Sequence, residues 1–167
     1  GKKGAIVMLD VNTGGTLALA SAPTFDPNMF TRRFSQAEWN AVTNDPATPL
    51  QNRALQSAYP PGSIFKLLVA VAGLETGRIR PETTVTCTGG GMYYGQYRSC
   101  NAIHGRVNLE SAIGRSCNVY FYELGTKLSR EQIIEVAQRY GLGAQTGIDL
   151  LNEATGIVPT KEWVAQA

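Results

Sequence analysis

The sequence has no long apolar segment and no long run of like charge. Its longest apolar stretch, Leu67–Leu74, is far shorter than a membrane-spanning helix. Charged residues make up only 17% of the 167 residues and leave a net charge of +2, so the charge pattern gives no reason to expect nucleic-acid binding. No repeat or low-complexity tract is present, and a hydrophobic content of 43% is enough for a core. We therefore expect a piece of a soluble globular domain.

A serine and a lysine lie three residues apart at the expected start of an apolar helix. Pro60-Pro61-Gly62 favours a turn just before Ser63, and Gly77 is a plausible stop, so the pattern predicts a buried helix over residues 63–76. Positions i and i+3 share a helix face, so Ser63 and Lys66 can touch. A partly buried, unprotonated lysine can take the serine proton and make the hydroxyl a nucleophile. Taken alone, the pair also fits a helix-capping serine followed by an exposed lysine.

A second polar element, Ser116-Cys117-Asn118, lies between two apolar stretches further along the chain. Residues two apart point to different sides of a helix, so Ser116 and Asn118 can face one cleft only from a turn or irregular link. Ser-x-x-Lys followed by Ser-x-Asn forms the first two thirds of the signature of penicillin-binding proteins and class A β-lactamases. The two elements together therefore favour a serine acyl-transfer site.

Further segments resemble class B penicillin-binding proteins, in particular the penicillin-binding protein 2 group, the transpeptidases of cell elongation. The segments match the family in their order and spacing. They are Ala18–Asn28, Asn52-Arg53-Ala54, Tyr59–Ser63, His104-Gly105, Thr146–Leu150 and Glu153–Gly156. The resemblance covers essentially the whole chain. Ile64 stands where the family usually has threonine, a position that carries no chemistry.

The resemblance and the local patterns predict an α+β fold, as a partial penicillin-binding/β-lactamase-like transpeptidase domain. It would comprise an N-terminal β-hairpin and a helical subdomain, with the remaining sheet strands missing. Strands are expected at 5–9 and 16–20, on either side of Asn12-Thr13-Gly14-Gly15. Besides the helix at 63–76, helices are expected at 35–43, 107–115, 118–127 and 130–140, with loops and short strands at 78–106.

The third signature of the family, Lys-Thr-Gly on a strand lining the cleft, does not occur in the sequence. In the family this strand comes later in the sequence than the position that corresponds to Ala167. We therefore expect residues 1–167 to be a partial transpeptidase domain lacking the C-terminal Lys-Thr-Gly strand. We also expect the membrane anchor that the family carries upstream to be absent from this chain.

The resemblance implies a peptidoglycan D,D-transpeptidase that cross-links stem peptides through a serine acyl-enzyme and is the target of β-lactams. Ser63 would be the nucleophile, Lys66 its base, Ser116 a proton relay, and Asn118 the residue that holds the substrate backbone. No cofactor would be required for catalysis. The implied partners are D-Ala-D-Ala stem peptides, β-lactams and membrane proteins of the elongation machinery. The implied location is the cell envelope, on the periplasmic or extracytoplasmic face of the inner membrane.

Two other functions share part of the signature and stay open at this point. A β-lactam-sensing receptor domain also carries Ser-x-x-Lys, but it is acylated once and signals. A serine β-lactamase would in addition need a deacylating group, and we find no glutamate with a recognisable motif. The fragment itself is expected to be inactive or weak, because one oxyanion donor would come from the missing strand.

The three cysteines and the single histidine form a separate pattern. Cys87, Cys100, His104 and Cys117 supply three sulfurs and one imidazole, a complete ligand set for tetrahedral zinc. Some penicillin-binding protein 2 enzymes are thought to hold zinc through a histidine and a cysteine at the positions of His104 and Cys117. A structural zinc ion is therefore one hypothesis. A Cys87–Cys100 disulfide and buried inert thiols are the alternatives.

Overall fold

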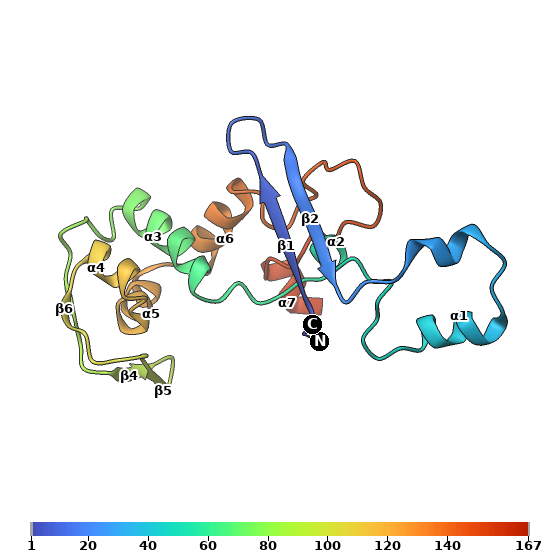
Figure 1. Ribbon diagram of the computed structural model, residues 1–167. Helices are drawn as coiled ribbons and strands as arrows, with labels where there is room; N and C mark the ends of the chain where they lie inside the picture. The colour runs from blue at the N-terminus through green and yellow to red at the C-terminus, as the bar shows by residue number, and fades with distance from the viewer. Residues whose placement is uncertain (1, 167) are drawn as a thin grey trace. The chain divides into compact units, whose positions relative to one another are not determined.

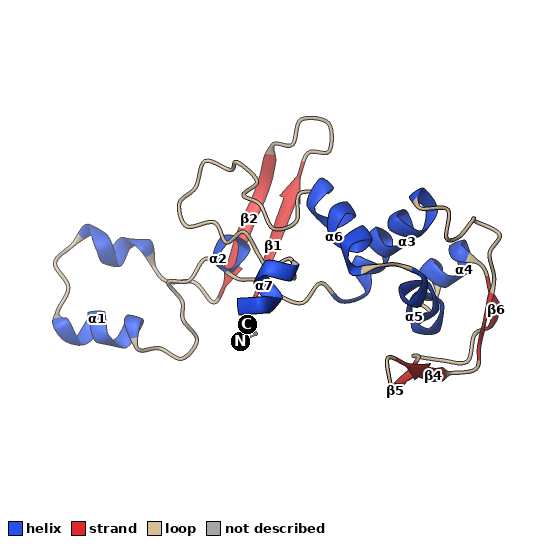
Figure 2. Ribbon diagram, turned by 180° about the vertical axis from the view of Figure 1, so that it is seen from behind, coloured by secondary structure: helices blue, strands red, loops and turns tan. Residues whose placement is uncertain are grey.

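The computed structural model describes residues 2–166, which divide into two compact units. The first unit contains the residues up to Ala58 together with Gly147–Ala154. The second contains Tyr59–Thr146 and the segment that begins at Thr155. Figure 2 shows the long red hairpin of the first unit and the several helices of the second. Helices combined with antiparallel strand pairs confirm the predicted α+β class.

The first unit is built on the predicted β-hairpin. Strands β1 (Gly4–Leu9) and β2 (Thr16–Ala22) pair antiparallel (Figure 1). The register shifts between Met8 and Leu9, at the end of β1. In the connecting loop the Asp10 N–H donates to the Gly15 carbonyl, and the Gly14 N–H donates to the Asp10 carbonyl, both at 2.8 Å. Gly14 has a φ of +73°, a conformation that glycine adopts without steric cost.

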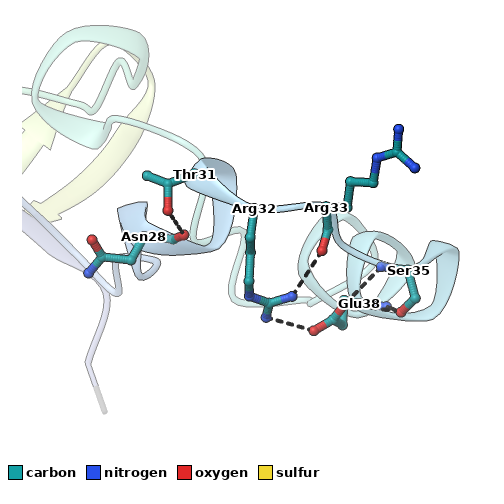
Figure 3. Close-up of polar contacts among 6 residues, drawn as sticks. All are labelled: Asn28, Thr31, Arg32, Arg33, Ser35 and Glu38. Carbon is teal, nitrogen blue, oxygen red and sulfur yellow. Dashed lines mark hydrogen bonds and ion pairs between the residues drawn. The ribbon is translucent and has the colours of Figure 1, made fainter.

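An excursion after β2 contains the 3-10 helix η1 (Pro27–Thr31) and helix α1 (Gln36–Thr43). Ser35 caps α1: its hydroxyl accepts the Glu38 N–H at 3.2 Å, and the Glu38 carboxylate accepts the Ser35 N–H at 2.7 Å. Arg32 donates to the same carboxylate at 2.8 Å (Figure 3). The Arg32 hydrogen bond and those from Ser35 lower the pKa of Glu38 to about 2.

Aromatic side chains pack in sequence along this excursion. Phe25 meets Phe30 edge to face, and Phe30 meets Phe34 in the same way, with ring centroids 5.4 and 5.7 Å apart. Phe34 then stacks on Trp39 of α1 with the centroids 5.7 Å apart. These contacts hold η1 and α1 together where no strand pairing is available.

The buried charge of the first unit is Arg53, at the start of the short helix α2 (Arg53–Gln56). Its guanidinium donates to the carbonyls of Ala47 and Thr48 and to the Thr48 hydroxyl. Its backbone N–H donates to the Ser21 hydroxyl of β2 at 3.0 Å. Arginine suits this position because its rigid fork can satisfy several fixed oxygens at once. The residue connects the end of the excursion to the hairpin.

The second unit has a helical core. Its main helices are α3 (Lys66–Glu75), α4 (Leu109–Gly114), α5 (Asn118–Lys127) and α6 (Arg130–Arg139). Helix α3 packs against both α5 and α6, and α6 lies beside it in Figure 1. A Cβ at Gly73 would lie 2.9 Å from a methyl carbon of the buried Leu124, so the close approach of α3 to α5 depends on this glycine. Arg139 forms an ion pair with Glu75.

Short strands precede the α4 and α5 helices, as predicted for residues 78–106. Strand β3 (Val85–Cys87) pairs with β6 (Gly105–Val107), and β4 (Gly90–Tyr93) pairs with β5 (Gln96–Ser99), both antiparallel. The helices predicted at 107–115, 118–127 and 130–140 are found within two residues of their expected bounds. The last of them begins after the predicted cap Ser129.

The structure differs from the prediction in the helix expected at 63–76. A 3-10 turn, η2 (Gly62–Phe65), precedes α3, and Leu67 and Leu74 are 52% and 39% exposed. The helix is therefore less buried than predicted, because only Ala70, Ala72 and Gly73 are buried and Leu74, beyond the first turn, is exposed. The short helices η1, α2 and α7 (Lys161–Gln166) were not predicted. Within residues 2–166, no helix is both long and apolar enough to cross a membrane.

Candidate active site

Ser63 and Lys66 are brought together by the turn at the start of α3. Gly62 has a φ of +57° and directs the chain from the preceding prolines into η2. Ser63 is exposed, whereas Lys66 is half-buried. The Lys66 amine lies 3.2 Å from the Ser63 hydroxyl oxygen, so the contact expected from the i, i+3 spacing is present.

Ser116 and Asn118 reach the same amine from the link between α4 and α5. Ser116 has a φ of +52°, which is uncommon for a residue with a side chain, and Asn118 is the first residue of α5. Lys66 Nζ lies 2.9 Å from the Ser116 hydroxyl oxygen and 2.6 Å from Asn118 Oδ1. The irregular link that the sequence required is therefore present. Its backbone strain occurs where the polar groups converge.

The hydrogen-bond partners of Lys66 differ in what they can donate. The Ser116 carbonyl, at 2.8 Å, and Asn118 Oδ1 only accept. The hydroxyls of Ser63 and Ser116 can donate as well, and the Ser116 hydroxyl lies 2.9 Å from that of Ser63. A neutral amine can give its two N–H groups to the two acceptors and offer its lone pair to a hydroxyl. The geometry thus suits Lys66 as a base.

The surroundings of Lys66 also favour the neutral form. Partial burial lowers the pKa of its ammonium group, while the nearby Cys100 and Cys117 act in the opposite direction when ionised. The amine lies 5.7 Å from the centre of the Phe121 ring, one of the groups that shield it. A lysine with a lowered pKa is a stronger candidate for proton transfer near neutral pH.

The predicted cysteine and histidine set gathers into one cluster. The ligand atoms of Cys87, Cys100, His104 and Cys117 all lie within 4.8 Å of one another. Cys100 Sγ is 4.0 Å from Cys117 Sγ and 3.6 Å from His104 Nδ1. All three cysteines are free thiols, so the alternative Cys87–Cys100 disulfide is not formed in this structure. Through Cys117 the cluster includes the residue between Ser116 and Asn118 in the sequence.

The two sulfurs nearest the active-site link have different acidities. Burial acts to raise the pKa of Cys100, but backbone N–H groups of Val119, Ala102 and Asn118 together lower it to about 6. Burial raises the pKa of Cys117 to about 11. Cys100 is therefore the sulfur of this pair that carries negative charge most readily.

Sequence reasoning did not find the residues that hold Asn118 from the side of β5. Its side-chain amide nitrogen donates to the Ser99 carbonyl at 3.2 Å, and its backbone N–H donates to Cys100 Sγ at 3.2 Å. No local pattern relates residues 18 or 19 positions apart across an intervening strand and helix. The only signal was the membership of Cys100 and Cys117 in one proposed ligand set.

A Ser-x-x-Lys helix start that faces a Ser-x-Asn turn on an α+β scaffold is the combination found in penicillin-binding proteins and class A β-lactamases. The family model described as "Penicillin binding protein transpeptidase domain" matches residues 4–167, and the chain belongs to this family.

Individual relatives agree with this assignment. The chain is 40% identical over 167 residues to the peptidoglycan D,D-transpeptidase MrdA of Escherichia coli K12, covering 98% of this chain and 26% of MrdA. It resembles the crystal structure of penicillin-binding protein 2 from Pseudomonas aeruginosa, with a TM-score of 0.91 and 36% identity over 99% of this chain and 39% of that one. It also resembles the structure of penicillin-binding protein 2 from Helicobacter pylori, with a TM-score of 0.92 and 35% identity over 99% of this chain and 32% of that one.

These comparisons confirm the predicted resemblance to the penicillin-binding protein 2 group and the partial transpeptidase fold. The chain spans about a quarter of the length of the curated relatives it matches. These relatives are named as D,D-transpeptidases, not as receptors or β-lactamases.

Proposed function

We propose that the protein containing this chain is a peptidoglycan D,D-transpeptidase and a target of β-lactams. The observation that carries the proposal is the convergence of Ser63, Ser116 and Asn118 on the Lys66 amine. We further propose that residues 1–167 form part of the transpeptidase domain, and that the Lys-Thr-Gly strand lies elsewhere in the same domain. The names of the related D,D-transpeptidases support this function.

In the proposed acylation step, Ser63 Oγ attacks the carbonyl carbon between the last two D-alanines of a stem peptide. Lys66 takes the hydroxyl proton as the new ester bond forms, and the Ser63 N–H stabilises the oxyanion. The C–N bond then breaks, and the terminal D-alanine leaves as an amine. Ser116 lies 2.9 Å from both Ser63 Oγ and Lys66 Nζ, so it can pass the proton to that amine.

In the second step an amine from a neighbouring stem peptide attacks the ester and forms the cross-link. Its proton returns through Ser116 and Lys66 to Ser63, which restores the free enzyme. A β-lactam would instead open its strained amide on Ser63 and remain attached. Every proton transfer in this scheme uses side chains of this chain, so the reaction requires no cofactor.

Asn118 has the substrate-binding role in this proposal. Its Oδ1 faces Lys66 and one N–H of its amide goes to the Ser99 carbonyl, which fixes the plane of the amide. A carboxamide nitrogen carries two N–H groups. The second is the donor that we propose for a peptide carbonyl of the stem peptide, or for the side-chain amide of a penicillin.

Partners and location are proposed from the relatives. One solved structure is described as a complex between penicillin-binding protein 2 and MreC from Helicobacter pylori. Another is described as a peptidoglycan synthase complex that coordinates polymerisation and crosslinking. We propose that the intact protein works with membrane proteins of the elongation machinery. It would act on the extracytoplasmic face of the inner membrane, where its stem-peptide substrates are cross-linked.

The direct test is acylation of the intact protein by a fluorescent penicillin. We expect labelling of the parent and none of Ser63→Ala, because the acyl bond has no acceptor atom there. Ser129→Ala, which removes the hydroxyl that caps α6, is the matched control and should label normally. Equal labelling of the parent and Ser63→Ala would contradict the assignment.

A product assay separates transpeptidation from the related functions. With a donor ending in D-Ala-D-Ala and an amine acceptor, we expect release of one D-alanine for each cross-link formed. Mass spectrometry after exposure to penicillin should show a stable adduct on the peptide that contains Ser63. Rapid loss of the adduct would indicate a β-lactamase, and a stable adduct without cross-linking would indicate a receptor.

We also propose that Cys87, Cys100, His104 and Cys117 hold a structural zinc ion. Three sulfurs and one imidazole are a donor set that zinc favours. With Zn–S bonds of about 2.3 Å, two sulfurs of a tetrahedral site lie about 3.8 Å apart. The 4.0 Å between Cys100 and Cys117 is close to this spacing, so the residues fit the ion. Its role would be to tie β3, the end of β5 and the α4–α5 link together.

Elemental analysis tests the metal directly. Protein purified without chelator should contain about one zinc ion per chain, and His104→Ala should lose it. Chelation should lower the melting temperature, because structural zinc contributes to folding. Arg106→Ala is the control, because Arg106 is exposed, lies two positions from His104 and is not one of the proposed ligands; this variant should retain the metal. Zinc-free protein with an unchanged melting temperature in chelator would contradict the proposal.

A further inference from the structure

Asn118 is held at three polar atoms by three residues from two different parts of the second unit. Its Oδ1 accepts from Lys66 Nζ at 2.6 Å, and its Nδ2 donates to the Ser99 carbonyl at 3.2 Å. Its backbone N–H donates to Cys100 Sγ, also at 3.2 Å. Two of the three contacts therefore come from consecutive residues at the end of β5, outside both sequence motifs of the site.

The contact to Cys100 supplies a hydrogen-bond acceptor that the start of α5 otherwise lacks at its N-cap. The first N–H groups of a helix have no intrahelical acceptor, and a side chain at the N-cap usually supplies one. The N-cap here is Cys117, whose side chain makes no such hydrogen bond. Cys100 Sγ accepts instead from the N–H of Asn118, the first residue of the helix. A residue from a distant segment thus caps the helix that carries Asn118.

We propose that Cys100 is a positioning residue that sets the direction of the Asn118 amide toward the substrate. Its sulfur fixes the backbone of Asn118, the first residue of α5, and the adjoining Ser99 carbonyl fixes the plane of the side-chain amide. The second N–H of that amide can therefore point in only one direction. The inference rests on the substrate role proposed for Asn118. It concerns the sulfur as a hydrogen-bond acceptor.

Two penicillins provide a readout that separates positioning from general stability. Benzylpenicillin has an acylamino side chain whose amide can bind Asn118, whereas 6-aminopenicillanic acid has the same ring system without that amide. The ratio of their second-order acylation rate constants therefore reports on the Asn118 contact. Because both rates are measured on one sample, the fraction of folded protein cancels in the ratio.

For the intact protein we expect Asn118→Ala to lower this ratio about 5- to 10-fold, the effect of one lost hydrogen bond. Cys100→Ala should lower it about 3- to 10-fold, and Cys100→Ser should recover most of the loss because its hydroxyl can accept the N–H. In the double variant the losses should be less than multiplicative, since both act through one amide. Cys87→Ala removes a sulfur that bonds the Ala102 carbonyl rather than Asn118, so it should slow both penicillins alike.

The outcomes distinguish failure of this inference from failure of the proposed function. A ratio that falls in Asn118→Ala but stays at the parent value in Cys100→Ala would overturn the positioning role alone. A ratio unchanged in Asn118→Ala would overturn the substrate role of Asn118 and, with it, the inference. If Cys100→Ala does not fold, Cys100→Val, which also removes the acceptor atom but keeps a side chain of similar size, gives the same decision.

Discussion

The two compact units differ in what stabilises them. All the buried hydrophobic side chains within residues 2–166 belong to the second unit, where they extend from Ala70 to Ala137. In the first unit the buried residue is Arg53, while Ile6 and Leu17 of the hairpin are 68% and 66% exposed. The first unit thus depends more on polar ties. The second has a packed core that can hold reactive groups in place.

Each unit shields one basic side chain, and the partners of the two differ in kind. Arg53 donates to two backbone carbonyls and a threonine hydroxyl, so its hydrogen bonds fix the chain. Lys66 contacts two serine hydroxyls that can give up protons, one of them exposed. An arginine stays protonated and can only donate, whereas a lysine with a lowered pKa can accept. The hydrogen-bond partners, more than burial, therefore distinguish a cation with a structural role from one that can take part in proton transfer.

The largest expected effect is the loss of acylation in Lys66→Arg, because this change replaces a side chain that can accept a proton with one that can only donate hydrogen bonds. A guanidinium cannot take the Ser63 proton, so acylation by fluorescent penicillin should fall by about 10²–10⁴-fold. Thermal melting should change little, because active-site polar groups usually add little to stability. An acylation rate equal to the parent in folded Lys66→Arg would remove Lys66 from its proposed role.

The next effect is on the pH dependence of acylation. Only the neutral amine accepts a proton, so below the pKa of Lys66 the rate should rise about tenfold per pH unit. Because burial lowers that pKa from the ordinary 10.5, the rise should level off at a lower pH than for an exposed lysine. Stopped-flow acylation by benzylpenicillin across this range gives the profile. A flat profile, or one that levels off only near 10.5, would show that Lys66 is not the titrating base.

A smaller effect is expected when the structural cation is weakened by Arg53→Lys. A lysine keeps the charge but cannot donate to the Ala47 and Thr48 oxygens at once, which leaves an acceptor without a donor. We expect a loss of about 1–3 kcal/mol in the free energy of unfolding, measured with urea. Arg33→Lys, at an exposed position, should change it by less than about 0.5 kcal/mol. If Arg53→Lys lost no more unfolding free energy than Arg33→Lys, the bidentate hydrogen bonding of the Arg53 guanidinium would not contribute to stability.

The contrast between the two cations marks what could be predicted from the sequence. The Ser63–Lys66 contact follows from helical spacing, whereas the contact of Lys66 with Ser116, 50 positions away, could be expected only from the family signature. The burial of Arg53 could not be predicted, because its acceptors lie in an irregular loop with no periodic pattern. The contact between Cys100 and Asn118 is missed for a similar reason: it joins a strand end to a helix start, and tertiary structure alone determines it. The roles of the site residues and the zinc remain proposals.

The smallest expected effects concern helix caps, which occur in both units and involve no chemistry. Ser35 caps α1 in the first unit with Glu38 as its reciprocal partner, and Ser129 caps α6 in the second with Gln132. Ser35→Ala and Ser129→Ala should each cost about 1 kcal/mol of unfolding free energy, since each leaves a backbone N–H without its acceptor. Neither should change the acylation rate of the folded protein. A cap variant that slowed acylation as Lys66→Arg does would show that the site depends on distant helix ends, and the distinction between structural and chemical polar groups would then fail.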